Sequence, residues 1–297
     1  MLRRGPLHRR TGDTLLYHTT DHAKIPRLGL GTWKLTGDEC AASVAKAIEI
    51  GYRHIDTAAV YENEEAVGRG IRDSGIDRSE LFVATKIWMP RIEKGEVAEA
   101  MAESLDRLQM DSVDLVYLHW PINAMAIEDQ VGPLAECKTE GQAKLIGVSN
   151  YNQEQLLAAI SACPERLSAV QCEYHPYLDQ DPILKTARGF DMLFTSYSPL
   201  GRGPRGDLLE NPAVHRIAEA NGKSPVQVVL RWHLQQANVC AIPKATSEEH
   251  LRDNFGVFGW DLTGTDMKAL YGLMKPDGRM IDPDWAPQWD TGVGEAA

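Results

Sequence analysis

Short apolar runs alternate with longer amphipathic stretches along most of the chain. The runs are apolar at consecutive positions, which is typical of parallel strands that are buried on both faces. They recur at about the spacing of repeated strand–helix units. The predicted strands are Arg27–Trp33, His54–Ala58, Leu81–Ile87, Val113–His119, Lys144–Asn150, Ala169–His175, Met192–Pro199 and Val239–Lys244.

The stretches between these runs carry helix signals. Apolar side chains recur every three or four positions over residues 97–108, which places them on one helical face. Ser224 followed by Pro225 is typical of a helix start, because serine caps the helix and proline fits its first turn. Eight strands alternating with helices predict an α/β protein of the (β/α)8 TIM-barrel class.

A chain of 297 residues is a normal length for one such barrel. We therefore predict a single barrel domain over residues 15–297, preceded by a flexible tail at residues 1–14. Thr14–His18 and Lys24–Pro26 are expected to pair as a β-hairpin that plugs the barrel floor, and Lys275–Ala297 to form a C-terminal substrate loop. The main alternative is an open doubly wound sheet, which usually has a glycine-rich turn after its first strand.

One glycine motif of the form G-x-G-x-x-G is present, at Gly201, Gly203 and Gly206. It lies two-thirds of the way along the chain, contains Pro204 and opens no predicted helix, so it is a poor dinucleotide fingerprint. On a barrel, this loop follows the seventh strand and faces the active-site end. We expect it to cover the phosphates of a cofactor.

The net charge of −11 disfavours binding to negatively charged partners. Four arginines lie in the first ten residues, so the rest of the chain is even more acidic and would repel nucleic acid and anionic membranes. The five cysteines form no C-x-x-C pair, and the apolar runs are of strand length. These features predict a cytoplasmic protein with reduced thiols, no membrane or nucleic-acid partner and no secretory signal.

Polar residues lie on the predicted strands toward their carboxyl ends, or just after them, where barrel enzymes carry their active sites. The residues at these positions are Asp56, Tyr61, Lys86, His119, Ser149, Asn150, Gln171, His175, Tyr197, Ser198 and Lys244. Each alone is typical of something simpler: a lone lysine of a solvated surface, a lone tyrosine of packing, a lone histidine of a hydrogen-bonded core. Their succession at neighbouring strand ends favours a catalytic site.

The residue types suit one kind of chemistry. A free tyrosine has a pKa near 10 and is a poor acid at neutral pH, but a nearby ammonium lowers that pKa. A carboxylate holds the lysine charged, and a histidine can donate to a carbonyl oxygen. Such a site protonates a carbonyl that receives a hydride from a cofactor.

Five segments resemble signatures of the aldo-keto reductase family, and they occur in the family's order. They are Gly29–Trp33, Gly51–Ala58, Leu118–Pro121, Gly147–Asn150 and Ile242–Lys244. The chain is most similar to bacterial reductases of the 2,5-diketo-D-gluconate and methylglyoxal type, an impression that Trp285–Asp290 strengthens. The resemblance implies NAD(P)H-dependent reduction of aldehydes and ketones to alcohols, including dicarbonyls such as methylglyoxal or diketo sugar acids.

The resemblance also implies roles for individual residues. Tyr61 would be the general acid, Lys86 would lower its pKa, Asp56 would pair with Lys86, and His119 would orient the carbonyl. The residues implied in cofactor binding are Gly31, Thr32, Ser149, Asn150, Gln171, Tyr197, Ser198, Leu200, Lys244, Thr246, His250 and Asn254. Trp33, Trp88, Trp120 and His119 would line the substrate pocket, although Trp88 also suits ordinary core packing.

One position departs from the family pattern. The family usually places an arginine six residues after Lys244, where it binds the 2′-phosphate of NADPH, and this chain has His250 there. Histidine has an ordinary pKa near 6.5 and lacks the planar, permanently charged fork of arginine. We expect NADPH to be the cofactor, with NADH also used; alternatively, Lys244 with Thr246 or Ser247 suffices for a clear NADPH preference.

Two other functions compete with carbonyl reduction. A nicotinamide-binding, redox-sensing module would turn over slowly, and the intact set of Asp56, Tyr61, Lys86 and His119 disfavours it. A metal-dependent hydrolase would need clustered ligands such as H-E-x-x-H, which the sequence lacks, so no metal site is predicted. The expected partner is a small-molecule carbonyl substrate, and the expected state is a monomer.

Overall fold

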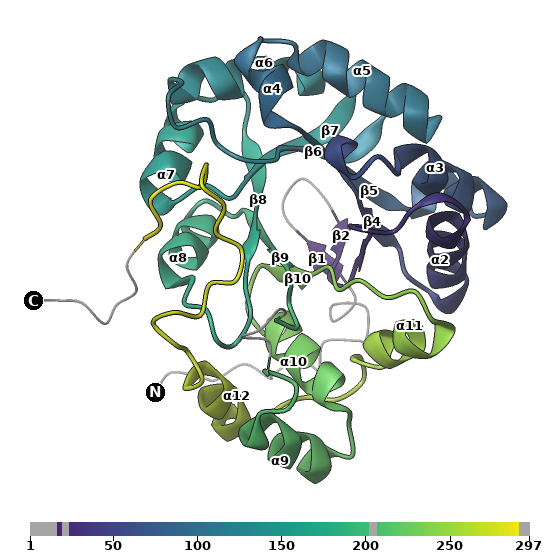
Figure 1. Ribbon diagram of the computed structural model, residues 1–297, viewed down its shortest axis with the longest axis vertical. Coiled ribbons are helices and arrows are strands. Elements are labelled where there is room, and N and C mark those ends of the chain that lie inside the picture. Colours follow the sequence, from purple (N-terminus) through teal and green to yellow (C-terminus); the bar gives the residue numbers. More distant parts are fainter. Residues whose placement is uncertain (1–16, 20–23, 202–206, 291–297) are drawn as a thin grey trace, which may run out of the picture.

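The computed structural model describes residues 17–19, 24–201 and 207–290 of the chain. Eight parallel strands follow one another around a sheet in their order along the chain, with helices on the outside (Figure 1). The strands are β3 (Leu30–Gly31), β4 (His54–Asp56), β5 (Phe82–Ile87), β6 (Val113–Leu118), β7 (Ala143–Ser149), β8 (Leu167–Glu173), β9 (Leu193–Tyr197) and β10 (Val239–Ala241).

Backbone hydrogen bonds join the two ends of this sheet. Leu28 pairs with Ala241 in parallel, and the N–H of Gly31 donates to the carbonyl of Pro243 at 3.1 Å. The eight predicted strands are therefore present and closed into a barrel. Several strands are shorter than predicted, because the chain leaves the sheet before the predicted run ends. The run Met192–Pro199, for example, leaves the sheet after Tyr197, since Ser198 takes a left-handed φ of +47° that a strand does not allow.

Helices cover the outside of the strands. They are α2 (Gly37–Ile50), α3 (Glu64–Asp73), α4 (Met89–Glu93), α5 (Val97–Leu108), α6 (Ile127–Thr139), α7 (Gln153–Ala162), α8 (Asp181–Gly189), α9 (Pro212–Asn221), α10 (Pro225–Leu234), α11 (Glu248–Phe255) and α12 (Gly264–Tyr271), with short 3-10 turns η1 (Ala59–Tyr61) and η2 (Arg78–Glu80). The predicted face of α5 is confirmed, since Val97, Met101 and Leu108 are buried. Ser224 caps α10 as predicted, and Gln227 completes a capping box with it.

A two-stranded antiparallel hairpin precedes the barrel, formed by β1 (Tyr17–Thr19) and β2 (Lys24–Pro26). Ile25 of β2 is fully buried in one cluster with Phe82 and Leu193, which begin strands β5 and β9. The hairpin therefore packs at the amino ends of the strands, opposite the end where barrel enzymes carry their sites. The predicted tail, residues 1–14, and Gly203 and Gly206 lie outside the described residues.

Within residues 17–19, 24–201 and 207–290, no helix is both long enough and apolar enough to cross a bilayer.

Candidate active site

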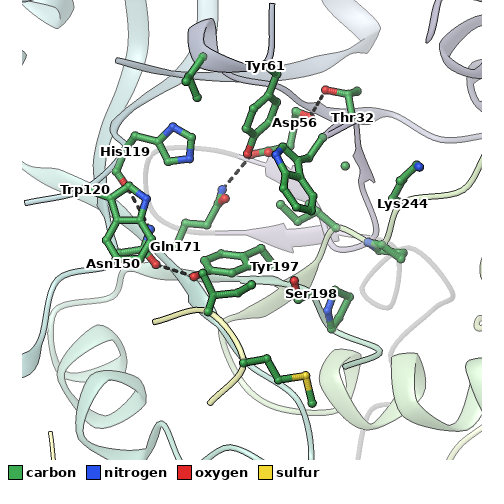
Figure 2. Close-up of a pocket in the computed structure, with 18 of the residues that line it drawn as sticks. Thr32, Asp56, Tyr61, His119, Trp120, Asn150, Gln171, Tyr197, Ser198 and Lys244 are labelled. Atoms are coloured by element: carbon green, nitrogen blue, oxygen red, sulfur yellow. Dashed lines mark hydrogen bonds between the residues drawn. The ribbon is translucent and has the colours of Figure 1, made fainter. Parts of the chain in front are cut away.

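A cavity of about 690 Å³ opens at the carboxyl ends of the strands (Figure 2). Its volume falls within the range of small-molecule and cofactor sites. The predicted site residues that line it are Gly31, Thr32, Trp33, Asp56, Tyr61, Trp88, His119, Trp120, Asn150, Gln171, Tyr197, Ser198, Leu200 and Lys244. Residues that are up to 213 positions apart in the sequence thus meet in one cavity, as the strand-end pattern predicted.

Lys86 lies fully buried on β5, beside the floor of this cavity. Its ammonium donates to Asp56 Oδ1 and, at 2.7 Å, to the carbonyl of Thr57. Gln171 Nε2 donates to the other carboxylate oxygen of Asp56 at 2.9 Å. Burial opposes the charge on Lys86, but Asp56 and Tyr61 outweigh it, and the pKa of Lys86 is raised. The lysine is therefore a permanent cation at this position.

Tyr61 lies directly above this ion pair. The Lys86 ammonium is 5.1 Å from the centroid of the Tyr61 ring. The turn that presents Tyr61 is held by Asn63, whose carboxamide donates to the carbonyls of Thr32 and Leu35 at 2.9 Å and accepts from Thr57 Oγ1 at 2.7 Å. Asn63 is itself 2% exposed, so the position of the tyrosine is fixed by a buried network.

His119 completes the group at the end of β6. Its ring meets Tyr61 and Trp88 edge-on, with centroids 5.6 Å and 5.2 Å apart. Burial and then the charge of Lys86 hold the pKa of His119 well below its ordinary value, so the ring is neutral. Its Nδ1 is buried without a hydrogen-bond partner. A neutral ring has one N–H, and placing it on Nε2 spares the cost of an unpaired buried donor.

Asn150 and Tyr197 are locked to each other on the opposite wall. The Tyr197 hydroxyl donates to Asn150 Oδ1 at 2.7 Å, and Asn150 Nδ2 donates to the carbonyl of His119 at 3.0 Å. Asn150 takes a left-handed φ of +65°, a conformation that asparagine tolerates better than most residues. Ser149 is fully buried, accepts from Asn150 Nδ2 at 3.1 Å and does not line the cavity, unlike the other residues predicted beside it.

The predicted phosphate-binding residues fall into two groups. Lys244 is exposed and lines the cavity on the side away from His119 (Figure 2). Thr246 and His250 are exposed but do not line it, and the N–H of His250 donates to Ser247 Oγ at the start of α11. Asn254 is buried and does not line the cavity.

Tryptophans form the wall near His119. Trp88 and Trp120 line the cavity as predicted, and Trp120 is only 5% exposed. Trp285 meets the Trp88 ring edge-on at 6.3 Å. The lining residues that the site prediction missed are Val60, Pro199, Ile242 and Pro243. Gly201 belongs to the glycine loop that was expected near the phosphates, and the predicted C-terminal substrate loop contributes Met280, Ile281, Asp282, Pro283 and Trp285. Which side chains of that loop face the cavity could not be predicted, because a loop has no periodic pattern that shows where its side chains point.

The residues along the cavity fit a nicotinamide dinucleotide. The Tyr197 ring offers a flat surface, and the amides of Asn150 and Gln171 lie next to it. Lys244 supplies a cation at the far side for a phosphate. Gly201, with a φ of +66°, lets the backbone follow the cavity between these two ends.

Comparison with known proteins agrees with this chemistry. The model of the "Aldo/keto reductase family" matches residues 27–275. The chain is 38% identical over 287 residues to a morphine 6-dehydrogenase of Pseudomonas putida, covering 91% of this chain and 97% of that protein. It is 37% identical over 272 residues to methylglyoxal reductase DkgB of Escherichia coli O157:H7, covering 90% and 99%.

Solved structures extend the likeness to the whole fold. A putative 2,5-diketo-D-gluconic acid reductase B superposes with a TM-score of 0.89 at 37% identity, over 93% of this chain and 99% of that one. An aldo-keto reductase from a deep-sea metagenome library superposes with a TM-score of 0.83 at 32% identity, over 90% and 97%. The chain therefore belongs to the aldo/keto reductase family of oxidoreductases.

Proposed function

We propose that this protein reduces aldehydes and ketones to alcohols with NAD(P)H, and that Tyr61 is the proton donor. The observation that carries the proposal is the packing of Tyr61 between a buried, ion-paired Lys86 and a neutral His119 at one cavity. Because reduction of a carbonyl places negative charge on its oxygen, the site needs a donor whose own anion is stabilised.

Each residue has a distinct part in this mechanism. A bound nicotinamide supplies the hydride. Tyr61 donates its hydroxyl proton to the carbonyl oxygen, and the ammonium of Lys86 stabilises the phenolate that remains. Asp56 keeps Lys86 charged and in place. His119, being neutral, donates a hydrogen bond from Nε2 to the same oxygen and so orients the carbonyl.

The cavity also suggests how the cofactor is held. Tyr197 would stack on the nicotinamide, with Asn150, Gln171 and the buried Ser149 fixing its carboxamide. The residues expected to follow toward the phosphates are Gly31, Thr32, Ser198, Leu200, Lys244, Thr246, His250 and Asn254. The substrate would lie between the cofactor and the wall of Trp33, Trp88 and Trp120. The names of the relatives suggest dicarbonyls such as methylglyoxal and diketo sugar acids as substrates.

Absorbance at 340 nm tests this function directly. Purified protein would receive methylglyoxal and either NADPH or NADH, with the Tyr61→Phe variant beside the wild type. Tyr271→Phe is a matched control, because the Tyr271 hydroxyl donates to Gln236 at 2.6 Å and does not line the cavity. We expect oxidation of the cofactor by the wild type and the control, with at least about a hundredfold loss in Tyr61→Phe.

Two results would contradict the proposal. Equal rates in Tyr61→Phe and the wild type would remove the tyrosine from the chemistry. Cofactor binding, seen by fluorescence, without oxidation across several aldehydes would favour a redox-sensing module over an enzyme.

We further propose that His250 weakens the preference for NADPH without abolishing it. A protonated imidazole binds a 2′-phosphate better than a neutral one, so the preference should rise in acid. The ratio of kcat/KM for NADPH and NADH, followed from about pH 8 to pH 5.5, tests this. A flat ratio would contradict a role for protonation of His250.

A further inference from the structure

A buried carboxylate lies at the end of β8, two residues beyond Gln171. The side chain of Glu173 is completely buried, and its two oxygens accept backbone N–H groups from a segment more than a hundred residues later. Met280 N donates to Oε1 at 2.9 Å, and Ile281 N donates to Oε2 at 3.0 Å. Both oxygens are therefore used to bind the C-terminal segment.

Two further groups offset the burial of this carboxylate. His175 Nε2 hydrogen-bonds Oε1 at 3.1 Å, and Arg279 forms an ion pair with Oε2, from which its Nη1 is 3.9 Å away. A buried carboxylate is strongly destabilising unless it accepts hydrogen bonds, and bonds to an ionised acceptor are the stronger kind. The two amides and the carboxylate thus depend on each other.

The segment held in this way covers the active site. We define residues 279–286 as the C-terminal strap; it lines the cavity with Met280, Ile281, Asp282, Pro283 and Trp285. Another attachment is peripheral: Asn123 Nδ2 donates to the carbonyls of Trp285 and Ala286 at 3.2 Å and 3.1 Å from an exposed position. Solvent competes for such exposed bonds, so the buried pair at Glu173 is the stronger attachment.

We propose that Glu173 is a positioning residue that holds the C-terminal strap over the cavity, and that it thereby determines how tightly carbonyls with a large apolar group bind. Trp285 meets Trp88, and Trp88 meets His119, so a bulky substrate placed against His119 contacts the strap. A small carbonyl at His119 does not extend that far. Glu173 takes no part in proton transfer, and only the substrate part of the inference rests on the proposed function.

Glu173→Gln is the informative substitution. Glutamine has nearly the same shape but only one acceptor oxygen, so its NH₂ group faces one of the two backbone donors. One hydrogen bond is lost and replaced by a contact between two donors. The strap should then separate from the barrel more often while the catalytic residues stay in place.

Hydrogen exchange of the full-length protein measures this without reference to activity. In Glu173→Gln, peptides that contain the amides of Met280 and Ile281 should exchange about tenfold faster than in the wild type. The matched control is Glu64→Gln, which also removes a fully buried carboxylate, one that accepts from Thr85 and Arg107 away from the strap. Equal exchange at the strap in Glu173→Gln and the wild type would overturn the proposal, as would equal acceleration in Glu64→Gln.

Steady-state kinetics test the consequence for substrates. For 2-naphthaldehyde, Glu173→Gln should raise KM about tenfold, whereas methylglyoxal should keep its KM and kcat within about twofold. An equal fall in kcat for both substrates would place Glu173 in the chemistry and overturn a positioning role. If the wild type reduces neither compound, the proposed function fails, and hydrogen exchange alone decides whether Glu173 holds the strap.

A second variant covers the case in which Glu173→Gln does not fold. Ile281→Pro removes the amide that Oε2 accepts and leaves the carboxylate in place. The Met280 amide should again exchange about tenfold faster. In the wild type, exchange of both amides at the rate of an unstructured peptide would refute the attachment outright.

Discussion

Acid should destabilise this protein in part through His233, which has no role in the proposed chemistry. The side chain is fully buried on α10, and its Nε2 lies 3.0 Å from the carbonyl of Pro199, which lines the cavity. Burial, reinforced by the nearby His175, lowers the pKa of His233 from 6.5 to about 3, although the bond to Pro199 opposes the shift. The folded protein therefore keeps His233 neutral where an unfolded chain would protonate it.

The size of the effect follows from these two pKa values. Between pH 6.5 and pH 3 the unfolded chain binds a proton at this position that the folded chain does not, so stability falls as the pH falls. The contribution is complete above pH 6.5 and is lost progressively down to pH 3. From pH 7 to pH 5 the loss is about 2 kcal/mol of the free energy of unfolding.

Urea unfolding at pH 7 and pH 5 measures this loss, with His233→Gln beside the wild type. Glutamine can still donate to Pro199 but does not titrate, so the variant should lose about 2 kcal/mol less than the wild type between the two pH values. His215→Gln is the control, because His215 has a half-exposed side chain and should leave the acid loss unchanged. An acid loss in His233→Gln equal to that of the wild type would refute the argument.

Three further outcomes are expected. Lys86→Met should lower kcat/KM at least about a hundredfold. Because it leaves Asp56 buried without its cation, it should also reduce the free energy of unfolding by about 3–5 kcal/mol. The double variant Lys86→Met with Asp56→Asn should regain stability in urea but not turnover. His250→Arg should raise the NADPH-to-NADH ratio of kcat/KM about tenfold, and an unchanged ratio would remove this position from cofactor selection. Gly68→Ala should lower the urea midpoint, because its Cβ would lie 2.2 Å from the carbonyl oxygen of Leu108; a midpoint equal to that of the wild type would mean that α3 can move.

The strand ends were the predictable part of this molecule. Tyr61, Lys86 and His119 lie at or after the ends of apolar runs whose spacing predicts a parallel barrel, and a barrel brings the carboxyl ends of its strands together. A local sequence pattern thus specified a long-range arrangement. The hairpin of β1 and β2 was predictable for a different reason, because its two strands are close in sequence; the described part of its first strand is Tyr17–Thr19, where Thr14–His18 was predicted.

The C-terminal strap could be predicted to exist but not to have its observed path. That path depends on one buried carboxylate, Glu173, which lies more than a hundred residues away in sequence. Nothing in the pattern around Glu173 distinguishes it from a glutamate that ends a strand in solvent. The placement of Ser149 and Asn254 was similarly hidden, because sequence identity does not show whether a polar side chain faces the cavity or another side chain.

The two parts of the site differ in how they are supported, and this difference separates their functions. Asp56, Lys86 and His119 lie on or directly after strands whose backbone is hydrogen-bonded on both sides, so the residues proposed to support proton donation by Tyr61 are held rigidly. The C-terminal strap, which we propose selects among substrates, includes Ile281 and Trp285, which belong to no regular element and depend on side-chain bonds for their position. Substitutions near the strands should therefore change kcat for every carbonyl, whereas those that loosen the strap should reorder substrates by size. A change at Glu173 that slowed all substrates equally would contradict this division.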